Sequence, residues 1–205
     1  MTGTVILARH GQSTWNRDHL FQGQADPALT DLGREQAVEL ARACSGLGVT
    51  AVACSDLLRA QETATIVAAL LGLAAPQRIT DLRERWSRTL TGLSQDQIEE
   101  RYPGCLAAWR HGPATGLPGD SEPFGAFAVR VERGLRAAAR LGPTVLVVGH
   151  AGLFRVVGHL CGSGVDAAVA NTDGRQLTVT AGGFTDEGDP FAGAALRPRT
   201  GMGQL

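Results

Sequence analysis

The stretch Thr144-Val145-Leu146-Val147-Val148-Gly149-His150 is the clearest strand signal in the chain. Its continuous apolar run is typical of a strand that is buried on both faces of a sheet. Residues 153–160 follow with the apolar spacing of a helix, so the sequence predicts a strand over 144–148 that leads into a helix. His150 lies directly beyond the carboxyl end of this predicted strand.

Strand and helix signals alternate along the rest of the chain. A second apolar run, residues 4–8, ends at Arg9-His10-Gly11, and further strands are predicted over 49–54, about 78–80 and 177–180. Helices are predicted over 31–44 with Thr30 or Asp31 as the N-cap, from an Asp56 cap to about 71 with Gly72 at the end, over 94–100 and over 122–141. This alternation predicts an α/β fold, a three-layer sandwich with a mostly parallel central sheet and helices on both faces.

Length and composition fit one domain. The chain has 205 residues, 43% of them hydrophobic, which is enough for a single sizeable core. Residues 85–120 contain three prolines and a short amphipathic helix, so we expect a short cap inserted over the sheet within one domain of residues 1–205. The last residues, about 197–205, have no apolar pattern and predict a loose tail.

The charge and cysteine content narrow the class of partner. The formal net charge of −1 gives no general attraction to nucleic acids or membranes. All 19 basic residues are arginine, so an anion site must be built from arginine, histidine and backbone N–H groups. The four cysteines form no C-x-x-C pair, and the sequence shows neither a signal peptide nor a stretch of membrane-spanning length. We therefore expect reduced thiols and a cytoplasmic protein.

Three charged motifs follow predicted strands. They are Arg9-His10, the segment from Ser55 to Arg59, and His150. In open parallel sheets, ligands bind beyond the carboxyl ends of the strands, so these motifs predict one shared site.

The residue types suit the transfer of a phosphoryl group. His10 can supply a nucleophilic imidazole, and Arg9, Arg59 and His150 can bind the phosphoryl oxygens. Backbone N–H groups of the loop after His10 and of the helix near residue 151 can add donors. Glu84 is the leading candidate for the acid that protonates the leaving oxygen.

Each residue taken alone also has a structural interpretation. A histidine at a strand end is usually a hydrogen-bonded structural residue, and an arginine on a helix is usually solvated. A metal site with two histidines is a further alternative, but metal sites usually need three or more ligands. The functional interpretation therefore depends on the whole set.

Five ordered motifs closely resemble the histidine phosphatase superfamily, the phosphoglycerate-mutase-like group. The residues that carry the resemblance are Leu7-Ala8-Arg9-His10-Gly11-Gln12-Ser13 with Asn16, the stretch from Phe21 to Thr30 followed by Gly33 and Gln36-Ala37, Ser55 to Ala64, Leu82-Arg83-Glu84 with Gly92, and Val147-Val148-Gly149-His150. The triplet Arg-His-Gly alone is a weak signal, whereas the five motifs together, in the family's order from about residue 5 to about 160, are a strong one.

The resemblance implies a metal-independent phosphatase of the histidine acid type. It implies His10 as the phosphorylated nucleophile, Glu84 as the proton donor, and Arg9, Arg59 and His150 as the phosphate pocket. It implies substrate contacts from Asn16, Gln22, Gly23 and Ala151, and we add Arg83 and Arg85 because the segment 83–88 is unusually cationic. A solvated arginine face is the alternative for that segment. The implied partner is a small-molecule phosphate ester, with no metal or other cofactor, no nucleic acid and no membrane. Many relatives dimerise, which leaves a homodimer open.

Three departures from the family pattern leave other functions open. Ala151 stands where glycine usually follows the second histidine, Arg88 stands at another usual glycine, and Gly119-Asp120-Ser121-Glu122 replaces the segment Gly-Gly-Glu-Ser. A mutase of the phosphoglycerate type is one alternative, since Glu84-Arg85 resembles the mutase segment. Mutases of this type have a longer cap that contains two adjacent arginines, and this sequence has neither feature. A catalytically inactive phospholigand-binding module is the other.

Overall fold

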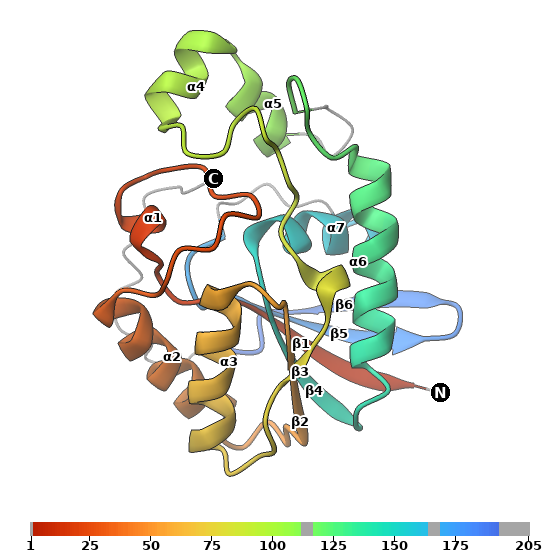
Figure 1. The fold of residues 1–205 in the computed structure, drawn as a ribbon. Coiled ribbons are helices and arrows are strands. Elements are labelled where there is room, and N and C mark those ends of the chain that lie inside the picture. Colours follow the sequence, from red (N-terminus) through yellow and green to blue (C-terminus); the bar gives the residue numbers. More distant parts are fainter. Residues whose placement is uncertain (1, 112–116, 164–168, 193–205) are drawn as a thin grey trace.

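The computed structural model describes residues 2–111, 117–163 and 169–192, so the predicted tail over 197–205 lies outside the described residues. One sheet runs through the molecule in the order β3-β2-β4-β1-β5-β6 (Figure 1). Its strands are β1 (Gly3–Arg9), β2 (Ala51–Cys54), β3 (Gln77–Arg78), β4 (Thr144–Gly149), β5 (Gly174–Thr180) and β6 (Gly183–Gly188).

The sheet is mostly parallel, as predicted. The strands β3, β2, β4 and β1 pair in parallel, and β5 and β6 form an antiparallel hairpin beside β1. Arg9 at the end of β1 is in register with Gly149 at the end of β4. The residues that follow these two strands, His10 and His150, are therefore brought side by side.

Helices cover both faces, which confirms the predicted α/β sandwich. The helices α2 (Asp31–Cys44) and α3 (Leu58–Leu70) lie on one face, and α6 (Phe124–Ala138) and α7 (Ala151–Cys161) lie on the other (Figure 1). Alternate residues of each central strand point into the two resulting cores. Val145 and Val147 of β4 pack toward α6 and α7, whereas Leu146 and Val148 pack toward α2 and α3. Burial on both faces explains why the strand sequence is apolar without alternation.

The helix starts follow local capping chemistry, with one correction. The Thr30 side chain accepts a hydrogen bond from the Gly33 amide at the start of α2, as predicted. The prediction that Asp56 caps α3 is wrong, because α3 begins at Leu58 without a side-chain cap. The Asp56 carboxylate is instead held by Arg83, with two hydrogen bonds of 2.7 Å.

The cap has a small core of its own. Its helices are α4 (Gln95–Arg101) and α5 (Cys105–His111), which lie beyond the sheet at the top of Figure 1. The buried side chains of this core are Phe21, Leu90, Ile98, Leu106 and Leu117. Phe21 comes from the segment between β1 and α2, and its backbone exchanges hydrogen bonds of 2.9 Å with Leu93 and Gly92. The cap is thereby tied to the segment that follows the His10 motif.

Four short or polar elements were not predicted: α1 (Thr14–Arg17), the 3-10 helix η1 (Thr80–Leu82), α5 and β6.

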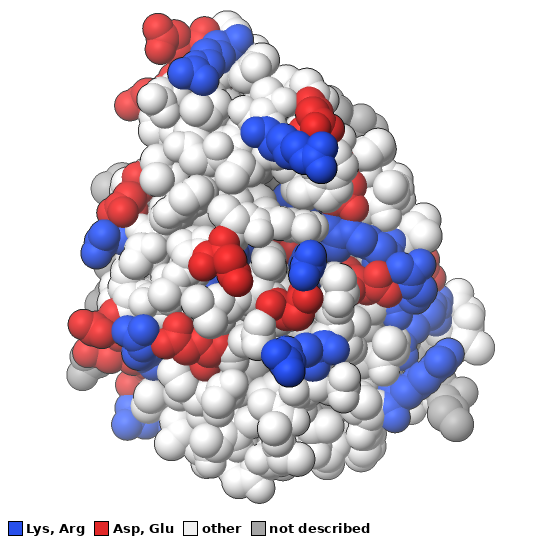
Figure 2. All heavy atoms as spheres, in the orientation of Figure 1, with Lys and Arg blue, Asp and Glu red and all other residues white. Residues whose placement is uncertain are grey.

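On the face shown in Figure 2, arginine and acidic side chains lie interspersed. None of the helices in the described ranges is both long and apolar enough to span a bilayer.

Candidate active site

His10 follows β1 and is buried, with 2% of its surface exposed. Its Nδ1 lies 2.6 Å from the Gly11 carbonyl oxygen, and Arg59 Nε donates to its Nε2 at 3.2 Å. A carbonyl only accepts and a guanidinium only donates, so Nδ1 carries the proton and Nε2 carries the lone pair. Burial, followed by the charges of Arg59 and Arg9, lowers the pKa of His10 well below 6.5. The imidazole is therefore neutral at neutral pH, with a lone pair on Nε2.

His150 lies beside His10 at the start of α7. The two ring centroids are 5.2 Å apart in an edge-to-face arrangement. Neither ring nitrogen of His150 has a hydrogen-bond partner among the described residues, although the side chain is fully buried. Burial, then Arg59, His10 and Arg9, lower its pKa well below 6.5. A buried, neutral donor without a partner is suited to an incoming oxygen atom.

Arg9 and Arg59 supply buried positive charge around the two histidines. Burial is the main cause that lowers the pKa of each guanidinium to about 10, so both remain charged at neutral pH. Arg9 Nη1 donates to the Val169 carbonyl at 2.5 Å. Arg59 donates to the carbonyls of Gly23, at 2.9 Å, and Ala25, at 2.7 Å. These contacts hold the guanidinium group of Arg9 at the end of β1 and that of Arg59 at the start of α3.

The backbone N–H groups after His10 do not serve as the predicted phosphate donors. The Gly11 amide donates to Thr63 Oγ1 at 3.1 Å, and the Gln12 amide donates to Gln36 Oε1 at 2.8 Å. Both groups are therefore committed to side chains of the two neighbouring helices, α3 and α2. In the free protein these two amides are therefore not available to an incoming anion.

Close backbone packing holds the His10 loop against α2. A Cβ atom on Gly11 would lie 2.3 Å from the Gly33 carbonyl oxygen, and one on Gly33 would lie 2.1 Å from the Gln12 carbonyl oxygen. Any side chain at either position would force these segments apart. This contact explains why glycine stands at both positions.

Asn16 supports the loop and does not line the pocket. It is buried, and its Oδ1 accepts from the Ser13 amide at 3.1 Å. Its neighbour Asn171 donates from Nδ2 to the His10 carbonyl at 2.8 Å and lies 3.4 Å from Asn16 Oδ1. Asn171 was not singled out in the sequence, because it lies far along the chain from the histidine motif.

Glu84 faces the histidines across the pocket. Its Oε1 accepts from the Arg85 amide at 2.7 Å, and its Oε2 accepts from the Gly152 amide at 3.0 Å. A Cβ atom on Gly152 would lie 2.1 Å from Oε1. The carboxylate is therefore seated on the first turn of α7.

A buried ion pair holds the backbone that carries Glu84. Arg130 of α6 donates to both carboxylate oxygens of Glu122, at 2.7 and 2.8 Å. The same guanidinium donates to the carbonyls of Asp81, Arg83 and Glu84, at 2.6 to 2.9 Å. Neither residue was predicted as part of the site, although Glu122 is the last residue of the unusual segment Gly119-Asp120-Ser121-Glu122.

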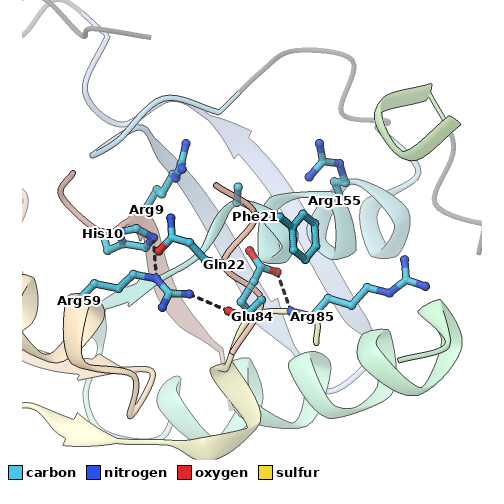
Figure 3. Close-up of a pocket in the computed structure, with 10 residues that line it drawn as sticks. Arg9, His10, Phe21, Gln22, Arg59, Glu84, Arg85 and Arg155 are labelled. Atoms are coloured by element: carbon cyan, nitrogen blue, oxygen red, sulfur yellow. Dashed lines mark hydrogen bonds between the residues drawn. The ribbon is translucent and has the colours of Figure 1, made fainter. Parts of the chain in front are cut away.

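A small pocket of about 30 Å³ brings most of the predicted residues together (Figure 3). Its lining residues are Arg9, His10, Phe21, Gln22, Gly23, Arg59, Glu84, Arg85, Ala151 and Arg155. Phe21 and Arg155 were missed. Arg155 lies four residues after Ala151, hence on the same face of α7, and this spacing was the available signal.

The three arginines of the segment 83–88 have different surroundings. Arg85 is buried and lines the pocket, and its Nε donates to the Glu122 carbonyl at 2.7 Å. Arg83 does not line the pocket, because Asp56 holds its guanidinium. Arg88 is exposed, pairs with Asp120 at 3.0 Å and does not line the pocket either.

Ala151 fits its place without strain. It is the first residue of α7, and among the described non-glycine residues only His19 and Thr172 have positive φ. A glycine is therefore not required at this position. The need for a residue without a side chain falls on Gly152 instead.

Possible metal ligands and free cysteine thiols occur in the described part of the chain. No group of three or more histidine, cysteine, aspartate or glutamate side chains in those ranges could hold a metal ion. All four cysteines are free, and burial raises the pKa of Cys44 and Cys54 to about 12. These two thiols are therefore uncharged.

Comparison with known proteins agrees with the motifs. The family model for the histidine phosphatase superfamily (branch 1) matches residues 5–187. The chain is 42% identical over 106 residues to a 2,3-bisphosphoglycerate-dependent phosphoglycerate mutase of Allorhizobium ampelinum, a match that covers 50% of each chain. It is 33% identical over 157 residues to a metal-independent phosphoserine phosphatase of Arabidopsis thaliana, covering 75% of this chain and 66% of that protein. The match therefore spans between half and two thirds of the length of these relatives.

The fold is also similar to that of solved phosphatases. A mycobacterial glucosyl-3-phosphoglycerate phosphatase, solved with VO3, aligns with a TM-score of 0.80 and 27% identity. The alignment covers 90% of this chain and 97% of that one.

Proposed function

The chain belongs to the histidine phosphatase superfamily, and from this premise we propose that it hydrolyses a small phosphomonoester through a phosphohistidine on His10. The observation that carries the proposal is the state of His10. The ring is neutral, its proton is on Nδ1, and its Nε2 lone pair lies beside the Arg59 guanidinium. This is the protonation state that a phosphoryl transfer needs from a nucleophilic histidine.

In the first step, Nε2 of His10 attacks phosphorus in line with the ester oxygen. A new N–P bond forms and the P–O ester bond breaks. Arg9, Arg59 and His150 donate to the three equatorial oxygens, where negative charge is spread in the transition state. The Arg59 Nε group, which donates to His10 in the free protein, turns its hydrogen bond to a phosphoryl oxygen.

Glu84 transfers its proton to the leaving oxygen in the same step, so that an alcohol departs. In the second step, the Glu84 carboxylate accepts a proton from water, and the resulting nucleophile attacks the phosphohistidine. The N–P bond breaks, inorganic phosphate leaves, and both His10 and Glu84 return to their first state. Every group in this cycle is a protein side chain or water, so we propose a metal-independent reaction.

Hydrolysis of p-nitrophenyl phosphate in the presence of EDTA tests this function. The matched variants are His10→Ala and His159→Ala, the latter at an exposed histidine. We expect turnover by the protein and by His159→Ala, no turnover by His10→Ala, and an acid-labile phosphoprotein after rapid quenching. Equal turnover in His10→Ala would contradict the mechanism, and loss of turnover in EDTA would contradict metal independence.

A phosphoglycerate-type mutase is the second candidate. It is favoured by the identity to named mutases and by Arg85, which lines the pocket directly after Glu84. Conversion of 3-phosphoglycerate to 2-phosphoglycerate without release of phosphate would support it. Binding of phosphate esters without turnover of any of them would instead support the inactive phospholigand-binding module.

A further inference from the structure

The turn that leads into β5 contacts both residues of the Arg9-His10 motif. The Arg9 amide donates to the Asp173 carbonyl at 3.0 Å, and the Thr172 amide donates to the Arg9 carbonyl at 3.1 Å. In a regular antiparallel ladder, a single residue opposite Arg9 would make both of these bonds. Here two consecutive residues share them, and the first of the two, Thr172, has a φ of 63°. This combination is a β-bulge of the type whose first residue is left-handed and usually glycine.

The bulge continues a tight turn. The Asp173 amide donates to the Ala170 carbonyl at 3.2 Å, which closes a four-residue turn with Asn171 and Thr172 at its two central positions. A positive φ at only the second central position is typical of a type II turn, where glycine or asparagine is preferred. Thr172 is β-branched and 4% exposed, so its backbone is held in a conformation that its side chain disfavours. Such strain persists only where the surrounding contacts impose it, and it is concentrated at functional sites.

The turn points the Asn171 side chain at the peptide bond that follows His10. Asn171 Nδ2 lies 2.8 Å from the His10 carbonyl oxygen and 3.4 Å from Asn16 Oδ1. Asn16 Oδ1 already accepts from the Ser13 amide, so both neighbours are acceptors and the Asn171 group that faces them is the amino group. Within the described ranges, Asn171 is the only donor to the His10 carbonyl.

The same peptide bond is held at its nitrogen. That nitrogen is the Gly11 amide, which donates to Thr63 Oγ1 at 3.1 Å. The peptide plane between His10 and Gly11 is therefore held by Asn171 at its oxygen and by Thr63 at its nitrogen. The next carbonyl along the chain, that of Gly11, lies 2.6 Å from His10 Nδ1 and accepts the ring proton. The direction of this carbonyl, and with it the lone pair on Nε2, depends on the peptide that Asn171 holds.

We propose that Asn171 is a positioning residue for the nucleophile. Its bond to the His10 carbonyl keeps the Gly11 carbonyl in place, and the Gly11 carbonyl keeps the ring proton of His10 on Nδ1. The strained turn at Thr172 is the element that presents Asn171 to His10. Asn171 does not line the pocket, so it acts only through His10. The effect on the reaction rate rests on the proposed function, whereas the effect on the His10 ring does not.

Asn171→Leu tests the bond, because leucine has a similar volume and no donor. We expect kcat/KM for p-nitrophenyl phosphate to fall about 10- to 100-fold, the effect of a small misplacement of a reacting group. Asn171→Ala, which removes most of the side chain, should show the same loss. The matched control is Val179→Ala in β5, a truncation in the core that lowers Tm away from the site and should leave kcat/KM within about twofold. A normal kcat/KM in both Asn171 variants would overturn the proposal.

Thr172→Gly separates the turn from the threonine side chain. Glycine adopts a positive φ freely, so this variant keeps the turn and the bond from Asn171 to His10. We expect its kcat/KM to stay within about twofold of the wild-type value. A loss as large as that in Asn171→Leu would show that the threonine side chain, and not the turn, presents Asn171.

Nitrogen-15 NMR of the histidine rings gives a readout that a loss of stability alone does not change. At neutral pH the wild-type His10 ring should have its proton on Nδ1, and its signals are assigned by their absence in His10→Ala. In Asn171→Leu we expect a mixture of the two neutral tautomers, whereas Val179→Ala should keep the wild-type pattern. An unchanged Nδ1–H ring in Asn171→Leu would refute the positioning role.

This measurement separates the inference from the proposed function, because it needs no turnover. A change of tautomer in Asn171→Leu would support the positioning role even if the protein hydrolysed no phosphoester. Hydrolysis by the wild-type protein, together with an unchanged ring and an unchanged kcat/KM in the Asn171 variants, would leave the phosphatase function standing and would refute the role of Asn171.

Discussion

The Gly152 amide donates to Glu84 Oε2 at 3.0 Å, and a Cβ atom on Gly152 would lie only 2.1 Å from Glu84 Oε1. The proposed acid is thus seated directly on the first turn of the helix that His150 precedes. The position of the carboxylate depends on glycine at this residue.

Gly152→Ala should displace the carboxylate and slow the reaction. We expect kcat with alkyl phosphates to fall about 100-fold, the usual contribution of a general acid, and kcat with p-nitrophenyl phosphate to fall less. Gly125→Ala, also in a helix but with open space around the added Cβ, is the matched control and should keep normal rates. Normal rates in Gly152→Ala as well would show that the seat of Glu84 tolerates a methyl group.

Glu84→Gln tests the acid role itself. An amide cannot donate a proton to the leaving oxygen, so turnover of alkyl phosphates should fall by a factor of about 100 or more. p-Nitrophenolate needs little protonation, and its release in the first step should be affected much less. The measurement is single-turnover kinetics with both substrates, and equal losses would remove Glu84 from this role.

Arg130→Gln should loosen the segment that carries Glu84. Breaking the buried pair with Glu122 leaves an uncompensated carboxylate, and we expect the free energy of unfolding to fall by about 3 kcal/mol. The variant should also show the leaving-group dependence described for Glu84→Gln, since the carbonyls of Asp81 and Arg83 lose their Arg130 donor and the Glu84 carbonyl keeps only Gln24. Arg133→Gln, which removes an exposed pair with Asp81 on the same helix, should change neither quantity noticeably. Urea unfolding and single-turnover kinetics check both.

Thr63→Val should disturb the nucleophile without touching the substrate. The hydroxyl accepts from the Gly11 amide and donates to the Arg59 carbonyl at 2.8 Å, so it joins the His10 loop to α3. Valine leaves a buried amide without a partner, which costs about 1–3 kcal/mol of stability. We expect a lower Tm and a lower kcat/KM, whereas Thr178→Val, whose hydroxyl donates to the Glu187 carboxylate far from His10, should lower neither noticeably.

The buried histidines predict a specific dependence of stability on pH. His10 and His150 have folded-state pKa values well below 6.5, lowered by burial and by Arg59 and Arg9, and Arg130 also contributes for His150. Below about pH 6.5 the unfolded chain binds protons that the folded protein does not, so the free energy of unfolding falls as the pH falls. Each histidine can lower the free energy of unfolding by at most about 1.4 kcal/mol per pH unit.

Urea unfolding between pH 7.5 and 5.0 measures this slope. The loss should continue as long as the pH stays above the folded pKa values of the two histidines, and these histidines should add no slope above about pH 7.5. His150→Gln should reduce the slope below pH 6.5. An equal slope in the variant would show that His150 keeps an ordinary pKa in the folded protein.

Much of the fold could be predicted from the sequence, because the buried strands and helices have strong local signals. The run over 144–148 predicts β4 closely, and Thr30 predicts the start of α2. The strand β6 was missed because its sequence, Gly-Phe-Thr-Asp-Glu-Gly, is polar and only partly buried at the edge of the sheet. The prediction that Asp56 caps α3 was wrong because Arg83, distant in the sequence, binds the Asp56 carboxylate. Local sequence patterns carry no information about such a partner.

The site was predictable where motifs lie at strand ends and unpredictable where it depends on tertiary contacts. Arg9, His10, Arg59 and Glu84 come together as the motifs implied. Asn171 and Arg130 lie about 20 residues from the His150 motif and reach the site only through tertiary contacts, whereas Arg155 lies one helical turn after Ala151 and its spacing was overlooked. The expected backbone donors after His10 were wrong for the same reason, since helices α2 and α3 satisfy them with side chains.

Phe21 belongs at once to the core of the cap and to the wall of the pocket. In a chimera made by exchanging residues 85–120 with those of a relative, the Phe21 ring would therefore no longer fit the core of the new cap, although it would still line the pocket. The segment around Phe21 has to be exchanged with the cap for the chimera to fold and to acquire the donor's selectivity. Selection for new substrates should, by the same reasoning, change these two distant stretches of the gene together.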